Sequence, residues 1–302
     1  MHLPRRVTVV EVGPRDGLQN EKTTIAAADK IAFVNRLADA GHAVIEVSAF
    51  VSPTWVPQMA DAADVFAGIT RHSGVRYTAL VPNRAGLERA IAAGVNEVAI
   101  FAAASETFSR KNINQSIDES LAAYRTVVHE AKNAGLQVRG YLSTGFHCPF
   151  EGPVAPAKVA DVAARLHDMG VFEVAVSDTI GAATPGDVLH VVGAVCERLP
   201  VEQVALHFHD TRGTALANVL AGLDYGVTTF DSSAGGLGGC PYAPGAAGNL
   251  ATEDLLYMLN GLGIETGVSI DAVARASRFI ETKLDHKLPS RFLQAPRLKT
   301  DN

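Results

Sequence analysis

The segment Ala157-Lys-Val-Ala-Asp-Val-Ala-Ala-Arg-Leu-His-Asp-Met-Gly-Val-Phe-Glu-Val-Ala-Val-Ser177 contains the unit from which most of the chain is built. Its first part, Ala157–Met169, has a helical pattern, and Gly170 follows as the expected left-handed cap. The apolar, β-branched run Glu173–Ser177 comes almost at once and predicts a strand. A helix, a glycine and a strand in this order are typical of a parallel sheet covered by helices.

The same alternation of strand-like and helix-like segments runs from one end of the chain to the other. The predicted strands are Val7–Val12, Ala43–Val47, Arg76–Leu80, Glu97–Phe101, Gln137–Leu142, Glu173–Ser177, Gln203–Phe208 and Thr228–Asp231. The predicted helices are Ala26–Ala40, Ala85–Ala93, Asp118–Ala134, Ala157–Met169, Asp187–Leu199 and Thr214–Tyr225, with Ile270–Leu284 as one or two additional helices. Many of these helices end in a glycine followed by the next strand, namely Gly41, Gly94, Gly135, Gly170 and Gly226.

Eight βα units favour an α/β fold of the (β/α)8 TIM-barrel type with extra C-terminal helices. The length of 302 residues suits a barrel of about 250 residues with additions. We expect a single domain over residues 1–302, in which about 264–302 form a helical extension packed on the barrel. An open doubly wound sheet is the structural alternative, but the regular rhythm leaves no obvious second domain.

Composition narrows the class of protein. Apolar residues make up 47% and charged residues 19%, which fits a soluble globular enzyme. The net charge is −6 and no Lys/Arg-rich run occurs, so we expect no nucleic-acid partner. Neither a long apolar run nor a signal-like amino end is present, so we expect a cytoplasmic protein without a membrane span. Cys148, Cys196 and Cys240 form no Cys-x-x-Cys pair and are expected to be reduced thiols.

The first feature that points to chemistry is His207-Phe-His-Asp210 at the end of a predicted strand. Residues two apart on a strand face the same side, so His207 and His209 should point together into the barrel mouth. Two imidazoles at a strand end suit a divalent metal. The alternative is a pair of buried histidines satisfied by hydrogen bonds.

Further ligands are available at neighbouring strand ends. Asp16 follows the first strand and Asn249 follows the eighth, and a closed barrel makes these strands neighbours. Two histidines, a carboxylate and an amide oxygen form a set that suits Mg2+ or Mn2+. Taken alone, Asp16 could cap a loop, and Asn249 could cap a helix that starts near Leu250.

Two more charged residues lie beside these ligands. Arg15 precedes Asp16 and could polarise a substrate carbonyl and hold an enolate oxygen. Glu46 is placed at the end of the second strand, where an unpaired acid is costly to bury, and Arg15 is its natural partner. For Arg15 the alternative is a surface ion pair.

The most distinctive stretch, Asp231–Asn249, is rich in glycine and carries Cys240 near its centre. It predicts a mobile loop above the barrel mouth that could bring the thiol into a closed site, where it moves a proton. Phosphate binding by the glycines is the alternative, but no Gly-Lys-Ser/Thr ending is present. A surface loop with an incidental cysteine is the other alternative.

With these residues in place, nearly the whole chain resembles the 3-hydroxy-3-methylglutaryl-CoA lyases, within the metal-dependent barrel lyases and Claisen synthases. The stretches that carry the resemblance are residues 12–22, 48–59, 177–181, 207–211, 236–243 and 248–254. The resemblance implies metal-dependent cleavage of 3-hydroxy-3-methylglutaryl-CoA to acetyl-CoA and acetoacetate, as in leucine degradation and ketone-body formation. It also implies an acyl-CoA as the binding partner and a homo-oligomer, either a dimer or a tetramer.

Roles for individual residues follow from the same resemblance. The implied metal ligands are Asp16, His207, His209 and Asn249. The implied catalytic residues are Arg15, Glu46, Asp178, His207 and Cys240: Arg15 holds the enolate, Glu46 supports Arg15, Cys240 handles the proton, and Asp178 or His207 serves as the base. The implied substrate-binding residues are Arg15, Gln19, Lys22 and Thr179.

Some positions depart from the family pattern. This chain has His147 where a glycine is common, in a stretch Ser143-Thr-Gly-Phe146 that is also unusual, and Arg212 where a tyrosine is common. These changes lie at strand ends near the acyl group, so they bear on the substituent at C3 of the substrate. The alternatives are a lyase for a related 3-hydroxy-3-alkylglutaryl-CoA or citramalyl-CoA, a Claisen condensation synthase, and a metal-binding barrel without activity.

Overall fold

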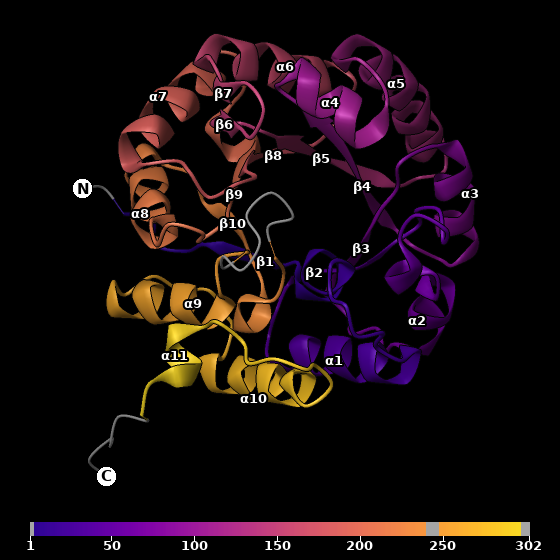
Figure 1. Ribbon diagram of the computed structural model, residues 1–302, viewed down its shortest axis with the longest axis vertical. Coiled ribbons are helices and arrows are strands. Elements are labelled where there is room, and N and C mark those ends of the chain that lie inside the picture. Colours follow the sequence, from indigo (N-terminus) through magenta and orange to yellow (C-terminus); the bar gives the residue numbers. More distant parts are fainter. Residues whose placement is uncertain (1–2, 240–247, 297–302) are drawn as a thin grey trace.

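The computed structural model describes residues 3–239 and 248–296, and in this part of the chain a closed parallel barrel is surrounded by helices (Figure 1). Around the ring the strands follow the order β1-β10-β9-β8-β5-β4-β3-β2. Their bounds are β1 Thr8–Glu11, β2 Val44–Ala49, β3 Arg76–Leu80, β4 Glu97–Ala103, β5 Gln137–Ser143, β8 Glu173–Asp178, β9 Val204–Phe208 and β10 Thr229–Ser232. The expected (β/α)8 barrel and all its strands are confirmed.

The helices lie outside the ring of strands. Their bounds are α1 Ala27–Asp39, α2 Ala62–Gly68, α3 Arg84–Ala92, α4 Glu106–Ile113, α5 Ile117–Asn133, α6 Pro156–Asp168, α7 Pro185–Cys196, α8 Ala215–Tyr225, α9 Thr252–Gly261, α10 Ile270–Glu281 and α11 Arg291–Gln294. Each of the five glycines predicted to follow a helix has a positive φ, from 69° at Gly94 to 110° at Gly226. In this part of the chain, no helix is long and apolar enough to cross a membrane.

Several short elements were not predicted. They are the helices α2, α4, α9 and α11 and a two-stranded hairpin of β6 (His147–Cys148) and β7 (Gly152–Pro153). Each is shorter than the window over which a hydrophobic period can be recognised. The hairpin lies directly after β5, so it covers the carboxyl end of the barrel rather than forming part of its wall.

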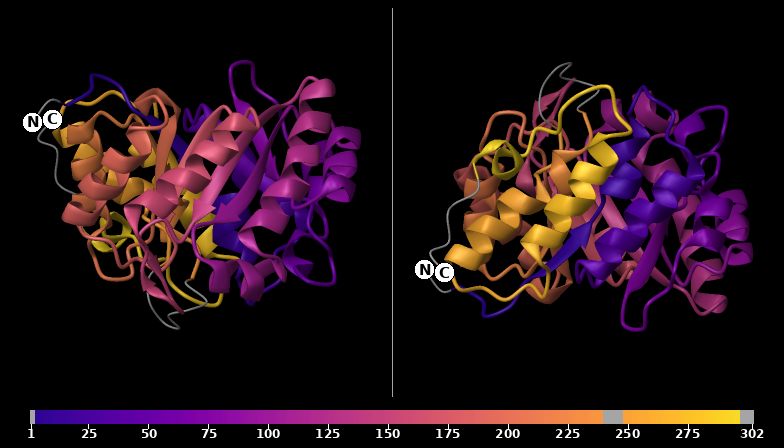
Figure 2. Two further views of the ribbon diagram at one scale, coloured as in Figure 1. Left: turned by 90° about the horizontal axis from the view of Figure 1, so that it is seen from above. Right: turned by 90° about the horizontal axis from the view of Figure 1, so that it is seen from below.

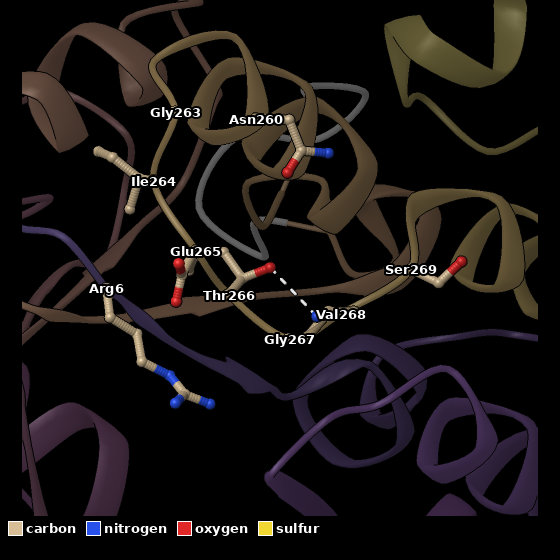
Figure 3. A pocket seen from close by; sticks show the side chains of 9 residues that line it. All are labelled: Arg6, Asn260, Gly263, Ile264, Glu265, Thr266, Gly267, Val268 and Ser269. Atoms are coloured by element: carbon tan, nitrogen blue, oxygen red, sulfur yellow. Dashed lines mark hydrogen bonds between the residues drawn. The ribbon is translucent and has the colours of Figure 1, made fainter.

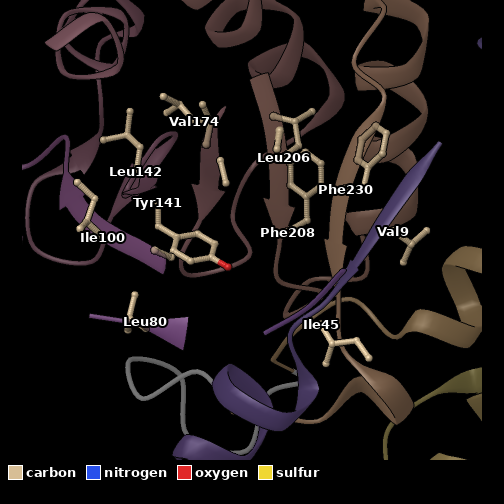
Figure 4. Packing of buried hydrophobic residues seen from close by; sticks show 14 of the residues in the cluster. Val9, Ile45, Leu80, Ile100, Tyr141, Leu142, Val174, Leu206, Phe208 and Phe230 are labelled. Carbon is tan, nitrogen blue, oxygen red and sulfur yellow. The ribbon is translucent and has the colours of Figure 1, made fainter. Parts of the chain in front are cut away.

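The side chains alternate between the two faces of the barrel wall. Leu142, Leu206 and Phe230 belong to the main apolar core (Figure 4). Arg139 and Asp231, at positions of opposite parity, reach each other with bonds of 3.1 and 2.8 Å. Because β5 and β10 are not adjacent in the ring, this ion pair must cross the barrel interior. A pair of oppositely charged side chains therefore fills part of the barrel interior.

The C-terminal helices pack beside the first helix of the chain. Figure 2 shows α10 along α1, and the guanidinium of Arg36 lies 4.5 Å from the centre of the Phe279 ring between them. Lys283 adds an ion pair of 3.0 Å to Asp29. This contact extends the apolar core beyond the helices that belong to the barrel.

The turn at Gly41 gives a test of this packing. Gly41 has a φ of 100°, and a Cβ there would collide with the carbonyl oxygen of Gly267, whereas Gly135 has a φ of 79° and open space around it. We expect Gly135→Ala to lower the free energy of unfolding by about 1–2 kcal/mol, the cost of the left-handed conformation. Gly41→Ala should cost about 1–3 kcal/mol more, because the backbone must also move.

Urea unfolding of the two variants beside the unmodified protein measures both losses. Equal losses would show that the contact between Gly41 and Gly267 is not tight in solution.

Candidate active site

Three of the predicted metal ligands come together at the carboxyl end of the barrel. One ligand atom from each of Asp16, His207 and His209 lies within 4.8 Å of the others. His207 belongs to β9, Phe208 is the last residue of that strand, and His209 follows it directly. The imidazole centres are 5.3 Å apart, as expected for two side chains on one face of a strand.

Asp16 is presented by a π-helical turn, Gly13–Gly17, which directly follows β1. The carbonyl of Val12 accepts the amide N–H groups of both Asp16 and Gly17, at 2.8 and 3.2 Å. A π-turn adds a residue to the helical repeat and is frequent at functional sites. Here it places the carboxylate of Asp16 at the mouth of the barrel.

Asn249 completes the set from the other side of the ring. Its backbone forms a bridge with His209, and its Nδ2 donates to Asp16 Oδ2 at 2.9 Å and to the carbonyl of Leu237 at 3.1 Å. The helix that follows starts at Thr252, so Asn249 does not cap it. Its Oδ1 is buried and has no hydrogen-bond donor among the described residues.

The unpaired atoms of this cluster fit a cation. A buried acceptor without a donor is costly, and both Asn249 Oδ1 and His209 Nδ1 lack a partner among the described residues. Burial, reinforced by the neighbouring His207, lowers the pKa of His209 to about 4, so its imidazole is neutral and keeps a lone pair. Burial opposes ionisation of Asp16, but Arg15 and the two histidines outweigh it and hold its pKa well below the ordinary value. A divalent cation would satisfy these donors together.

Arg15 and Glu46 form the predicted ion pair. Arg15 Nε donates to Glu46 Oε2 at 2.6 Å, and Arg15 Nη1 donates to Asp16 Oδ1 at 2.6 Å. The guanidinium also lies over the ring of Tyr141, 5.4 Å from its centre. The expectation that Glu46 ends its strand is wrong, because β2 continues to Ala49 after a bulge between Glu46 and Ser48.

Asp231 and Arg139 are the functional residues that the sequence analysis did not single out. His207 Nδ1 lies 3.2 Å from Asp231 Oδ2, and Arg139 donates to both oxygens of the same carboxylate. Arg139 and the hydrogen bond from His207 outweigh burial and lower the pKa of Asp231. A charged residue within an apolar strand is costly to bury without a partner, and this is the signal by which the sequence indicates both residues.

Asp178 does not face an open site in this conformation. Its side chain is fully buried, and its two oxygens accept the backbone N–H groups of Ala182 and Ala183, both at 3.0 Å. The neighbouring Thr179 Oγ1 accepts the N–H of Thr144 at 2.8 Å. Both side chains therefore shape the loop after β8, and their predicted roles toward substrate remain untested.

The remaining predicted residues lie around the mouth. Gln19 has a buried Oε1 without a partner among the described residues, and Lys22 is exposed. Arg212 Nη1 donates to the carbonyls of Ile180 and Gly181, at 3.0 and 2.9 Å, and so braces the loop after β8. His147 has a buried Nδ1 without a described partner. Cys240 lies outside the described residues.

Two hollows in the described surface lie away from this cluster. The larger, about 700 Å3, is lined by Arg6, Glu265 and Ser269 among others (Figure 3). It belongs to the opposite end of the barrel, since Glu265 forms backbone bonds to the chain at Arg5 and Val7, just before β1. The second, about 480 Å3, is lined by Phe50, Met59 and residues of α2 and α3. Neither hollow is lined by one of the proposed metal ligands. The candidate site is therefore identified by its cluster of ligand atoms and ion pairs, and not by a cavity.

Metal binding by the purified protein tests the cluster directly. After treatment with a chelator, we expect calorimetric titration with Mn2+ to show saturable binding. His209→Ala removes a ligand rather than an outer partner of a ligand. Its loss of Mn2+ affinity should therefore exceed the about 10–100-fold loss that removal of an outer partner typically causes. His72→Ala is the control, because this imidazole is 44% exposed and pairs with Asp39. Unchanged affinity in His209→Ala would remove His209 from the ligand set.

The chain is similar over nearly its whole length to proteins of known sequence and structure. The sequence matches the HMGL-like family profile over residues 6–280. A mitochondrial hydroxymethylglutaryl-CoA lyase of Rattus norvegicus is 53% identical over 293 residues (97% of this chain, 90% of that protein), and a hydroxymethylglutaryl-CoA lyase of Bacillus subtilis (strain 168) is 51% identical over 294 residues (97% and 98%). The crystal structure of hydroxymethylglutaryl-CoA lyase from Pseudomonas aeruginosa has a TM-score of 0.96 and 53% identity (97% of this chain, 98% of that one). With a profile over most of its length and relatives alike over nearly all of it, the chain belongs to the HMGL-like family.

Proposed function

We propose that this chain is a divalent-metal-dependent lyase that cleaves 3-hydroxy-3-methylglutaryl-CoA to acetyl-CoA and acetoacetate. The observation that carries the proposal is the convergence of Asp16, His207 and His209 beside the Arg15–Glu46 pair. A metal site alone would fit many reactions. A guanidinium fixed next to the site narrows the choice. It would stabilise the negative charge that develops on the thioester oxygen when the carbon–carbon bond breaks.

The ligand set would be Asp16, His207, His209 and the Oδ1 atom of Asn249. When bound, a divalent ion supplies Lewis-acid polarisation of the C3 hydroxyl, which lowers its pKa. Mg2+ and Mn2+ are the ions we propose, because two of the four donors are oxygens and none is a thiolate.

Arg15 is the group we propose to hold the enolate of acetyl-CoA. Its Nε and Nη1 are committed to Glu46 and Asp16, and among the described residues its Nη2 makes no such bond. Arg15 is 7% exposed and held by two ion pairs, so the orientation of its guanidinium is set before substrate arrives. A donor fixed in this way does not have to reorganise as charge develops on the thioester oxygen.

The proton steps need an acid and a base. We propose Cys240 as the acid that protonates the carbon of the enolate, on the basis of its position in the glycine-rich stretch after β10. His207 suits a metal ligand better than a base, because its Nδ1 is taken by Asp231. Asp178 would need to release the N–H groups of Ala182 and Ala183 before it could accept a proton.

Other assignments remain proposals of finer detail. They are Gln19, Lys22 and Thr179 as substrate contacts, a homo-oligomer in solution, a cytoplasmic location and a place in leucine degradation. The runner-up activity is cleavage of a related 3-hydroxy-3-alkylglutaryl-CoA or citramalyl-CoA. The observation that favours it is the pair of unusual residues, His147 and Arg212, near the loop after β8.

A coupled assay of acyl-CoA cleavage tests the proposed reaction. With Mg2+ or Mn2+ present, we expect acetyl-CoA and acetoacetate from 3-hydroxy-3-methylglutaryl-CoA, and slower release from analogues with larger substituents at C3. Faster cleavage of an analogue would establish the runner-up activity. If no member of the panel releases acetyl-CoA, while acetyl-CoA and a keto acid condense, the chain is a synthase.

The acid is tested by Cys240→Ala. We expect kcat to fall by about 10²–10⁴-fold, the usual contribution of a positioned acid or base. Cys196→Ala is the matched control, because this thiol lies on α7, outside the barrel ring. Full activity in Cys240→Ala would assign the proton transfer to another group.

A further inference from the structure

The two histidines of the cluster differ in the hydrogen-bond partner of their Nδ1 atoms. His207 Nδ1 lies 3.2 Å from Asp231 Oδ2, whereas His209 Nδ1 has no partner among the described residues. Asp231 is 1% exposed, so no bulk water competes for its oxygens. Among the described residues, a specific outer partner is therefore present for His207 and not for His209.

Asp231 is itself held from across the barrel. Arg139, on β5, donates from Nη1 to Asp231 Oδ2 at 3.1 Å and from Nη2 to Oδ1 at 2.8 Å. A third bond, from Arg139 Nε to Glu173 Oε1 at 2.7 Å, anchors the guanidinium to β8. Three bonds to two carboxylates leave the guanidinium a single orientation.

Tyr141 packs against the same group. Its ring centre is 5.0 Å from the Arg139 guanidinium carbon, and its edge faces the His207 ring with centres 6.4 Å apart. One packed unit thus links β5, β10 and β9 beneath the proposed metal cluster. Its members are Arg139, Tyr141, His207 and Asp231.

This contact fixes which nitrogen of His207 carries a hydrogen. A guanidinium always donates, so the oxygens of Asp231 act as acceptors toward Arg139. The same carboxylate therefore accepts from His207 as well, which places the hydrogen on Nδ1 and leaves Nε2 for another ligand.

We propose that Asp231, oriented by Arg139, is a positioning residue that sets the ring angle and tautomer of His207 so that Nε2 faces the metal position. The inference rests on the proposed metal site and adds residues to which no role has been assigned. Carboxylates behind ligating histidines typically contribute about 10–100-fold to metal affinity.

The test compares Mn2+ affinity, measured by calorimetry and by electron paramagnetic resonance of free Mn2+, in three variants. Asp231→Asn keeps the shape but presents an amide to two donors, and we expect its dissociation constant to rise about 10–100-fold. Arg139→Lys keeps the charge but loses the two-pronged contact, so a smaller rise is expected. Asp61→Asn is the matched control, because the carboxylate of Asp61 also accepts two bonds from a buried cation, Lys30, and makes no described contact with Asp231 or Arg139.

A nitrogen-15 NMR spectrum of the histidines supplies a readout that does not depend on the variants folding. In the unmodified Mg2+-loaded protein, we expect the His207 Nδ1 signal to be that of a protonated nitrogen. A protonated Nε2 would overturn the proposal. So would equal Mn2+ affinity in Asp231→Asn and Asp61→Asn.

These outcomes are separate from the failure of the proposed function. If the unmodified protein binds no Mn2+, the metal site itself is wrong. If it binds Mn2+ and Asp231→Asn binds equally well, the metal site stands and the positioning role is wrong.

Discussion

The ion pair between Arg139 and Asp231 is the interaction on which the interior of the barrel depends. Two buried charges are expensive to remove from water, and the structure offsets this with a two-pronged contact and a third bond to Glu173. Removing one partner of such a pair typically costs about 3–5 kcal/mol, because the other charge is left buried and alone. The cost explains why the interior tolerates these charges only as a connected set.

The side chains connected to this ion pair also lie beneath the proposed active site. Asp231 lies against His207, and Tyr141 packs against Arg139 and His207. Arg15 also lies over the Tyr141 ring. The groups proposed to bind metal at the barrel mouth are therefore supported by ion pairs in the barrel interior. The side chains that stabilise the interior are therefore the same ones that contact His207, through the bonds from Arg139 to Asp231.

Closure of the ring brings the proposed metal ligands together. β1 pairs with β10, and β10 pairs with β9, so Asp16 and His207 become close although they are 191 positions apart in the chain. Asn249 reaches the same point because its backbone bridges to His209. An open sheet would leave β1 and β10 at different edges and would disperse these donors.

Most of the wall of the barrel was predictable. Alternating faces and glycine caps are local properties, and they indicated every strand and the longer helices. The short helices and the β6–β7 hairpin were missed because a few residues carry too little periodic signal. The place of Glu46 within its strand was also missed, since a bulge in β2 depends on the pairing partner and not on β2 alone.

The sequence by itself determined which donors exist and at which strand ends they lie. His207 and His209 share a face through the period of a strand, and Asp16 and Asn249 follow the first and last strands. Only the tertiary structure decided that Asp231 and Arg139 meet across the interior, and that Asp178 turns toward the N–H groups of its own loop. The physical reason is that alternation specifies the face of a strand, whereas the partner of a buried charge depends on the tilt and closure of the whole ring.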